Sequence, residues 1–345
     1  MKGKVLFIDY VYQKGHVNFN HIHIDAIRSA GYDVKIVLHS DIASQLDYPD
    51  SDYVAKLPRF LNMRGKRAVL NRIIFTVTLL YLKFKIRFSD YNHVVVSYCD
   101  EVTLGLLPLC RNMYIICHNT ATVASRVKLF FLKRLARHNT FVVFDDYMKK
   151  PLLENGITNV ALVSHGCVSP FDESHADTSL PEYFSAFRKV VFHPSSKADD
   201  TFVNSLVNSS ELADFLARND VLLLIHGDKK EGEKYPDNVR FISGFLPTAL
   251  YREIFLRSDI VLLAYPSSFQ NQVSGVSFEC VANRKNMLVL EHPALHYCRD
   301  FYNYDPIFSS TGELIEKMRA LTGDNGLHCV ATPESLTPDY LKIFG

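Results

Sequence analysis

Apolar residues occur along most of the chain in short, nearly uninterrupted runs, with stretches of helical character between them. Runs without polar alternation are typical of parallel strands that are covered on both faces. They predict strands at residues 5–8, 34–38, 94–97, 114–117, 141–144, 160–163, 190–193, 221–226, 239–242, 260–264 and 287–290. Helical patterns occupy residues 21–30, 147–155, 200–216 and 247–257. Strands that alternate with helices predict an α/β fold of doubly wound parallel sheets.

A polar, acidic segment with a proline, residues 172–182, interrupts the series of strands and has the composition of a linker. A chain of 345 residues can form two domains with separate cores. We therefore expect two Rossmann-like domains that face an interdomain cleft, because ligands bind at the carboxyl ends of parallel strands. The expected boundaries are 1–171 for the N-terminal domain, 172–187 for the linker, 188–325 for the C-terminal domain and 326–345 for a tail that packs toward the N-terminal domain.

Composition narrows the class of protein. The chain is 48% hydrophobic and 22% charged, with a formal net charge of +1, which gives no overall argument for a nucleic-acid partner. Seven cysteines without a CxxC pair are typical of reduced thiols rather than of a disulfide framework or a zinc site. Residues 2–9 are too short and too charged for a secretory signal and predict a first buried strand. Together these features predict a cytoplasmic protein.

The most informative motif combines small residues with one carboxylate, in the segment from Ser274 through Gly275 and Val276 to Glu279. It lies between two predicted strands, where a helix should begin. Helix N-termini present unpaired N–H groups and favour anions such as phosphate. A carboxylate there cannot bind the phosphate itself, so a sugar hydroxyl beside the phosphate is its natural partner. The motif therefore predicts a nucleotide site in which Glu279 binds the ribose.

Other candidates for the same site follow strands of the C-terminal half. Lys197, close to Ser195, can neutralise a diphosphate, although an exposed lysine is the alternative interpretation. Gly244 and Phe245 follow the strand at 239–242 and can contact a flat base, although a structural turn is equally compatible with them.

In the N-terminal half, Gly15 and His16 follow the first strand and are candidates for the acceptor side, with an ordinary turn as the alternative. His118 and Asn119 directly follow the strand at 114–117, where a polar pair can contact a ligand or cap the next helix, and Asn119 is the third candidate for the acceptor side.

Together these segments resemble GT-B-fold glycosyltransferases and are most similar to glycosyltransferase family 4. The matching segments are 144–155, 164–167, 238–247, 251–264 and 274–279. The resemblance implies an enzyme of the EC 2.4 class that moves a sugar from a UDP- or GDP-sugar to a saccharide acceptor. It also implies a retaining, metal-independent reaction without a cofactor, acceptor binding by the N-terminal domain and donor binding by the C-terminal domain.

The chain departs from the family pattern at one position. The family carries two glutamates eight positions apart, whereas this chain has Asn271 and Glu279. The resemblance implies that Asn271 stands where the donor sugar is contacted and that His118 binds donor oxygens. If transfer were inverting, the base would come from His16, Asp100, Glu101 or His118. A nucleotide-sugar epimerase and a non-catalytic homologue that binds nucleotide or protein remain as alternatives.

Two basic stretches, residues 59–87 and 126–137, stand out against the near-zero net charge. The first contains an apolar run, 73–82, that is far shorter than the ~20 residues needed to span a bilayer. Basic residues around an apolar run favour a helix that lies on an anionic membrane surface. The alternative is a pair of core helices with solvated basic faces. The pattern predicts a peripheral protein on the cytosolic face and a lipid-linked acceptor, as in lipopolysaccharide, capsule or glycolipid synthesis.

Overall fold

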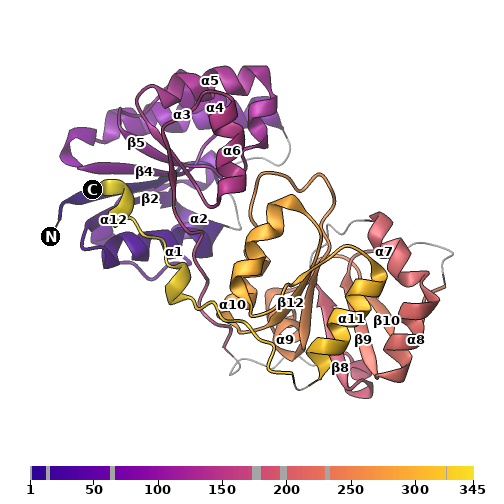
Figure 1. Cartoon of the computed structure of the whole chain (residues 1–345). Coiled ribbons are helices and arrows are strands. Elements are labelled where there is room, and N and C mark those ends of the chain that lie inside the picture. Colours follow the sequence, from indigo (N-terminus) through magenta and orange to yellow (C-terminus); the bar gives the residue numbers. More distant parts are fainter. Residues whose placement is uncertain are drawn as a thin grey trace. The chain divides into compact units, whose positions relative to one another are not determined.

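The computed structural model describes residues 2–12, 16–62, 67–172, 180–194, 200–229, 234–323 and 325–345. The chain forms two compact units (Figure 1). The first comprises Met1–Gly166, Asn271–Val273 and Leu336–Gly345, and the second comprises Cys167–Gln270 and Ser274–Ser335. The linker predicted at 172–187 lies partly outside the described residues, and the predicted cleft between the domains stays a prediction.

The described part of the first unit contains a parallel sheet of seven strands in the order β3-β2-β1-β4-β5-β6-β7. Its strands are β1 Lys4–Asp9, β2 Asp33–His39, β3 Tyr53–Leu57, β4 His93–Tyr98, β5 Met113–Ile116, β6 Thr140–Val143 and β7 Val160–Leu162. The helices are α1 His16–Ser29, α2 Ser40–Ala43, α3 Ala68–Lys85, α4 Glu101–Leu106, α5 Arg126–Ala136, α6 Asp146–Glu154 and α12 Leu341–Phe344. Figure 1 shows α3, α4 and α5 grouped on one side of the sheet and α1 on the other.

The described part of the second unit contains a parallel sheet of six strands in the order β10-β9-β8-β11-β12-β13. Its strands are β8 Lys189–His193, β9 Val221–His226, β10 Val239–Ile242, β11 Ile260–Leu263, β12 Asn286–Leu290 and β13 Ile307–Phe308. The helices are α7 Asp200–Val207, α8 Ser210–Arg218, α9 Thr248–Arg257, α10 Gly275–Ala282 and α11 Thr311–Thr322. The predicted α/β class with doubly wound parallel sheets is confirmed.

The strand order shows where each sheet is expected to bind a ligand. In the first unit the chain turns from the β2 side of β1 to the β4 side, so the topological switch point lies between β1 and β4. In the second unit it lies between β8 and β11. Ligands of open parallel sheets bind outside the carboxyl ends of the strands at such points. The residues that follow β1, β4, β8 and β11 are therefore the first candidates.

Two helix predictions were wrong in detail. The predicted helix 200–216 is divided into α7 and α8, because the Ser209 hydroxyl accepts a hydrogen bond from Leu212 N at 3.2 Å and caps a new helix. Helix α1 begins at His16, ahead of the predicted start at residue 21. His16 therefore belongs to the helix itself and not to a turn before it.

Residues 336–345 complete the core of the first unit. Tyr340 is fully buried, and its hydroxyl lies 2.7 Å from His23 Nδ1 on α1. Phe344 stacks on His93 with the ring centroids 4.2 Å apart. We expected a tail over 326–345, and its first ten positions, 326–335, belong to the second unit.

We predict that Gly166→Ala will destabilise the first unit strongly. Gly166 has φ of +81°, and an added Cβ would lie 2.4 Å from Ile22 Cγ2. Left-handed backbone costs a larger residue about 1–2 kcal/mol, and overpacking costs about 1–3 kcal/mol more. Gly156→Ala is the matched control, because Gly156 has φ of +76° and its added Cβ would meet nothing within 4 Å. Thermal denaturation should show a larger loss for Gly166→Ala, and equal losses would contradict the steric argument.

Candidate functional site

A network of buried polar side chains lies at the switch point of the first unit. Asp9, the last residue of β1, has no solvent exposure. Its Oδ2 accepts a hydrogen bond from Asn20 Nδ2 at 2.8 Å and lies 3.3 Å from His16 Nδ1. Asn20 Oδ1 in turn accepts from the Ser97 hydroxyl of β4 at 2.6 Å. The network ties β1, α1 and β4 together at their functional ends.

His118, two residues after the end of β5, joins this network through the backbone of Ser97. Its Nε2 lies 2.9 Å from the Ser97 carbonyl oxygen, and because a carbonyl only accepts, Nε2 carries the hydrogen. Its ring stacks on His16 with centroids 4.7 Å apart. Burial, and secondly the neighbouring His16, hold the pKa of His118 well below its usual value. His118 is therefore neutral near pH 7, with Nδ1 as a hydrogen-bond acceptor.

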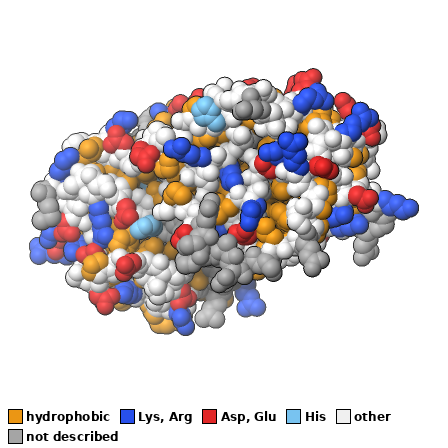
Figure 2. All heavy atoms as spheres, turned by 90° about the horizontal axis from the view of Figure 1, so that it is seen from below, with side chains coloured by type: hydrophobic (Ala, Val, Ile, Leu, Met, Phe, Trp, Pro, Cys, Tyr) orange, Lys and Arg blue, Asp and Glu red, His pale blue; other side chains and the backbone are white. Residues whose placement is uncertain are grey.

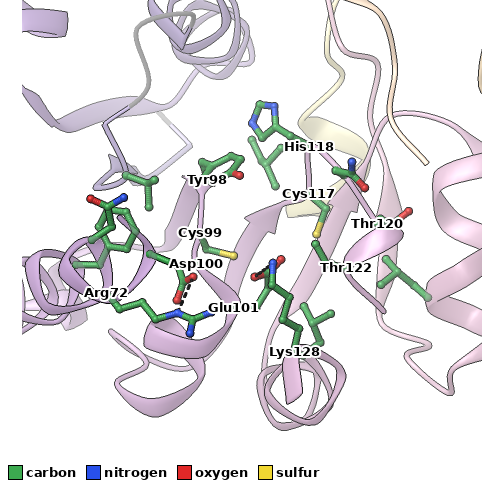
Figure 3. Close-up of a pocket in the computed structure, with 18 residues that line it drawn as sticks. Arg72, Tyr98, Cys99, Asp100, Glu101, Cys117, His118, Thr120, Thr122 and Lys128 are labelled. Carbon is green, nitrogen blue, oxygen red and sulfur yellow. Dashed lines mark ion pairs between the residues drawn. The ribbon is translucent and has the colours of Figure 1, made fainter. Parts of the chain in front are cut away.

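A cavity of about 410 Å³ opens beside this network, within the first unit (Figure 3). Its lining comes from α3, from the residues after β4 and β5, and from α5. Arg72 Nε lies 3.6 Å from Asp100 Oδ2, and Lys128 Nζ lies 3.2 Å from Glu101 Oε2. His118 and Asn119 also line the cavity. Polar, charged and aromatic groups thus converge at the carboxyl ends of two adjacent strands.

The other two acceptor-side candidates have different positions. His16 is buried and does not line the cavity but contacts His118, which does. Gly15 lies outside the described residues.

The structure brings the segment of Asn271 close to that of His118. Thr120 N donates a hydrogen bond to the Asn271 carbonyl oxygen at 2.9 Å, within the first unit. Asn271 has φ of +53°, a left-handed conformation that asparagine tolerates better than glutamate does. This backbone conformation gives a physical reason for asparagine at the position where the resembling family carries glutamate.

In the second unit, α10 begins with an open N-terminus. Ser274 is the N-cap, and its N–H donates to the Tyr297 hydroxyl at 2.9 Å while the Tyr265 hydroxyl lies 2.8 Å from its Oγ. Gly275 and Val276 are the first helical residues, and such N–H groups have no intrahelical acceptor. Gly275 is exposed, and a Cβ added to it would meet nothing within 4 Å. The helix start therefore has room for an anionic group.

Glu279 lies one turn further along α10 and is oriented by a tyrosine. The Tyr251 hydroxyl of α9 donates to Glu279 Oε2 at 2.5 Å. Burial raises the pKa of Glu279, and the hydrogen bond from Tyr251 acts in the opposite direction. Among the described residues, no group hydrogen-bonds to the other carboxylate oxygen, Oε1. One carboxylate oxygen is thus anchored while the second stays available to a ligand.

Of the remaining donor-side candidates, the structure describes two and leaves two outside the described residues. Gly244 has φ of +78°, and its carbonyl oxygen lies 2.9 Å from His226 Nε2. The neighbouring Phe245 side chain is 88% exposed, so it is available for contact. Ser195 and Lys197 lie outside the described residues. Within the described part of the chain, no group of three or more His, Cys, Asp or Glu side chains is placed to hold a metal ion.

The outer face of α3 is apolar, although it faces solvent. Its exposed side chains are Val69, Ile73, Val77, Leu80, Tyr81 and Phe84. The opposite face packs into the core through Phe75, Leu79 and Leu82. Val127 and Phe130 of α5 are also exposed. Of the predicted basic residues, Arg64 and Lys66 lie outside the described range.

Charges of both signs are mixed on another part of the described surface. On the face shown in Figure 2, Lys and Arg side chains are interspersed with Asp and Glu. No helix among the described residues is both long enough and apolar enough to cross a lipid bilayer.

Several site residues were not found from the sequence. Asp9 ends an apolar run with a carboxylate, and that signal could have identified it. Arg72 and Lys128 belong to the two basic stretches, but no local signal indicates their pairing, because it depends on how α3 and α5 pack beside α4. Tyr251 and Tyr297 likewise gain their contacts only through folding.

Comparison with known proteins supports the fold. No protein-family model and no curated protein sequence matches the chain. Solved structures do match, among them an α,α-trehalose-phosphate synthase (UDP-forming) from Burkholderia vietnamiensis, with TM-score 0.58, 9% identity and coverage of 93% of this chain and 92% of that chain.

The lipopolysaccharide outer core galactosyltransferase WaaB matches with TM-score 0.53 and 13% identity, over 98% of this chain and 96% of that chain. A protein named as a UDP-N-acetylglucosamine 2-epimerase from Listeria monocytogenes matches with TM-score 0.51 and 11% identity, over 94% of this chain and 89% of that chain. At these identities the similarity shows the fold alone. The chain has the GT-B fold, as predicted, while membership of family 4 stays a prediction.

The histidine network predicts an acid-sensitive first unit. Because the folded-state pKa of His118 is below its unfolded value, the unfolded chain binds more protons as the pH falls below about 6.5. His165, whose pKa is lowered to about 4 mainly by burial, acts in the same direction. The melting temperature should therefore fall between about pH 6.5 and pH 4.

His118→Gln should make this decline shallower, because glutamine does not titrate and keeps an N–H donor for the Ser97 carbonyl. His328→Gln is the control, because His328 is exposed. Thermal denaturation across the pH range measures both, and identical slopes for the wild type and His118→Gln would refute the assignment.

Proposed function

We propose that the protein is a glycosyltransferase that moves a sugar from a UDP- or GDP-sugar to a saccharide acceptor. The observation that carries this proposal is the pairing of an open helix start at Gly275 with Glu279 one turn beyond it, held by Tyr251. The helix start suits a diphosphate, and the available carboxylate oxygen suits the hydroxyls of a ribose. Their position after β11, next to the switch point, is where an open sheet binds nucleotide.

Leaving-group stabilisation follows from the same geometry. As the glycosidic bond breaks through an oxocarbenium-like state, negative charge grows on the departing diphosphate. The N–H groups of Gly275 and Val276 can donate to that charge, and Lys197 would add a cation. On the sugar side, His118 offers its Nδ1 to a donor hydroxyl, and Asn271 offers an amide. This arrangement supports the retaining, metal-independent reaction without a cofactor that the resemblance implies.

A nucleotide-sugar epimerase is the second candidate, since the Listeria protein shares the fold. An epimerase needs no acceptor, whereas the first unit has a cavity with charged side chains at the carboxyl ends of β4 and β5. That cavity favours the transferase. Acceptor-dependent release of nucleoside diphosphate by the purified protein separates the two activities.

Glu279→Ala should weaken UDP or GDP binding about 10- to 100-fold, because a charge-assisted hydrogen bond contributes about 1.5–3 kcal/mol. Tyr251→Phe should cause a smaller loss, because it removes only the contact that orients Glu279. Glu316→Ala, an exposed change on α11 of the same unit, is the control. Isothermal titration with each nucleotide provides the measurement. Unchanged affinity in Glu279→Ala would remove the ribose assignment.

We further propose that the acceptor is lipid-linked and that the protein works on an anionic membrane surface, in cell-surface polysaccharide or glycolipid synthesis. The support is the exposed apolar face of α3, with basic residues at both of its ends. Arg67 precedes the helix, and Lys83, Lys85 and Arg87 lie at its C-terminal end, all exposed. Apolar side chains that enter the headgroup region and cations that meet anionic lipid together produce interfacial binding.

Flotation with vesicles tests this surface. The wild-type protein should bind phosphatidylglycerol vesicles at low salt, bind less at high salt and bind phosphatidylcholine weakly. The double change Ile73→Ser and Phe84→Ser should lower the bound fraction about tenfold. Phe245→Ser should leave vesicle binding intact, because Phe245 is equally exposed, at 88% against 89% for Phe84, but lies in the second unit. Failure of the wild type to bind anionic vesicles would remove the membrane proposal.

A further inference from the structure

The cavity of the first unit carries two acid–base pairs whose charges cancel. Arg72 from α3 faces Asp100, and Lys128 from α5 faces Glu101 (Figure 3). The other lining residues carry no ionised side chain near pH 7, since His118 is held neutral. The lining therefore has no net charge, although it carries four ionised side chains among apolar ones.

These pairs leave hydrogen-bonding capacity unused. Lys128 meets only Oε2 of Glu101, and no described residue hydrogen-bonds to Glu101 Oε1. The 3.6 Å between Arg72 and Asp100 is longer than a hydrogen bond, so the guanidinium donors are not consumed by that carboxylate. The acids are also deeper than the bases, with side chains 17% and 12% exposed against 43% and 33%. Carboxylate acceptors thus line the inner part, and cationic donors line the outer part.

The remaining lining suits a hydroxylated ring. Phe75 and Tyr98 supply aromatic surface, Asn119 supplies an amide, and Thr122 supplies a hydroxyl. The volume of about 410 Å³ falls within the range of about 300–1,000 Å³ that is typical of small-molecule sites.

We infer that this cavity binds a neutral glycosyl unit of the acceptor and selects against anionic sugars. The inference rests on the proposed glycosyltransferase function and names the acceptor class. Hydroxyls of a neutral sugar donate to the carboxylates and accept from the cations, so each polar group gains a partner. A uronate or a phosphate would place its charge against Asp100 and Glu101, and an apolar ligand would leave the unused donors and acceptors of these side chains without partners.

A bracing role for the ion pairs is the competing explanation. Asp100 caps α4, since its Oδ1 accepts from Thr103 N at 2.9 Å, and an acid such as Glu101 in the first turn favours the helix dipole. These roles account for the acids but do not require cations from α3 and α5. The Glu101–Lys128 pair therefore distinguishes the two explanations better than Asp100 does.

The test compares two probes that share ring and chain, n-octyl β-D-glucopyranoside and n-octyl β-D-glucopyranosiduronic acid. They differ only in that the glucoside carries a hydroxymethyl group where the glucuronide carries a carboxylate. Dissociation constants are measured by saturation-transfer NMR below micelle formation, on the full chain without nucleotide. The wild type should bind the neutral probe at least about tenfold more tightly, because like charges disfavour the wrong ligand.

Opposite charge changes should move this preference in opposite directions. Glu101→Gln leaves Lys128 unpaired, so the ratio of the two dissociation constants should approach one or reverse. Lys128→Met should increase the preference for the neutral probe. Glu253→Gln is the matched control: the side chains of Glu253 and Glu101 are 11% and 12% exposed, and each lies 3.2 Å from its basic partner, but Glu253 pairs with Arg257 in the second unit. The control should keep the wild-type preference.

If the ion pairs only brace the fold, the changes should weaken the binding of both probes equally or lower the melting temperature. The ratio of the two dissociation constants would then stay the same, and that result would overturn the inference. Absence of binding of either probe to the wild type overturns it as well. Titration with UDP and GDP on the same samples separates the two proposals. If the preference shifts as expected but no nucleotide binds, only the glycosyltransferase proposal fails. If nucleotide binds and Glu101→Gln leaves the preference unchanged, only the cavity assignment fails.

Discussion

Asp9 places a carboxylate without solvent exposure at the end of β1, whose residues from Val5 to Ile8 are buried and apolar. A buried carboxyl group is stabilised by polar partners. The strand pairing shifts register between Ile8 and Asp9, so that Asp9 lies opposite Tyr98. His16 and Asn20 of α1 then reach the carboxylate, and Asn20 connects it to Ser97. The geometry of His118 depends on this chain of contacts, because the same Ser97 offers the carbonyl that fixes its tautomer.

Burial sets protonation in both units. It lowers the pKa of His118 and raises that of Glu279, because a desolvated site disfavours the charged form of either group. The two residues differ in what opposes this effect. The hydrogen bond from Tyr251 helps to keep Glu279 ionised, whereas the stacked His16 pushes His118 further toward the neutral form. Glu279 thus offers a carboxyl oxygen to hydroxyls, and His118 offers an uncharged ring nitrogen.

Most of the fold could be predicted because buried parallel strands have a local signature, an apolar run without alternation. Strand β3 was not predicted, because it lies at the sheet edge and alternates between buried and exposed positions. The position of His118 and Asn119 could be predicted, since a residue after a central strand reaches the functional edge. The partners of Arg72 and Lys128 could not, because these pairs form between helices that are distant in sequence. The left-handed backbone of Asn271 is likewise set by tertiary contacts and not by its neighbours.

The buried position of Tyr340 and Phe344 has a consequence for how the protein is made. Ribosomes release a chain from its N-terminus, and domains generally fold in that order. Here the core of the first unit takes in side chains that are translated only after the whole second unit. During synthesis the pocket for these aromatic rings, around His23 and His93, stays open to solvent. The first unit to leave the ribosome is therefore the last to be completed, and the second unit can fold while the first still exposes part of its core.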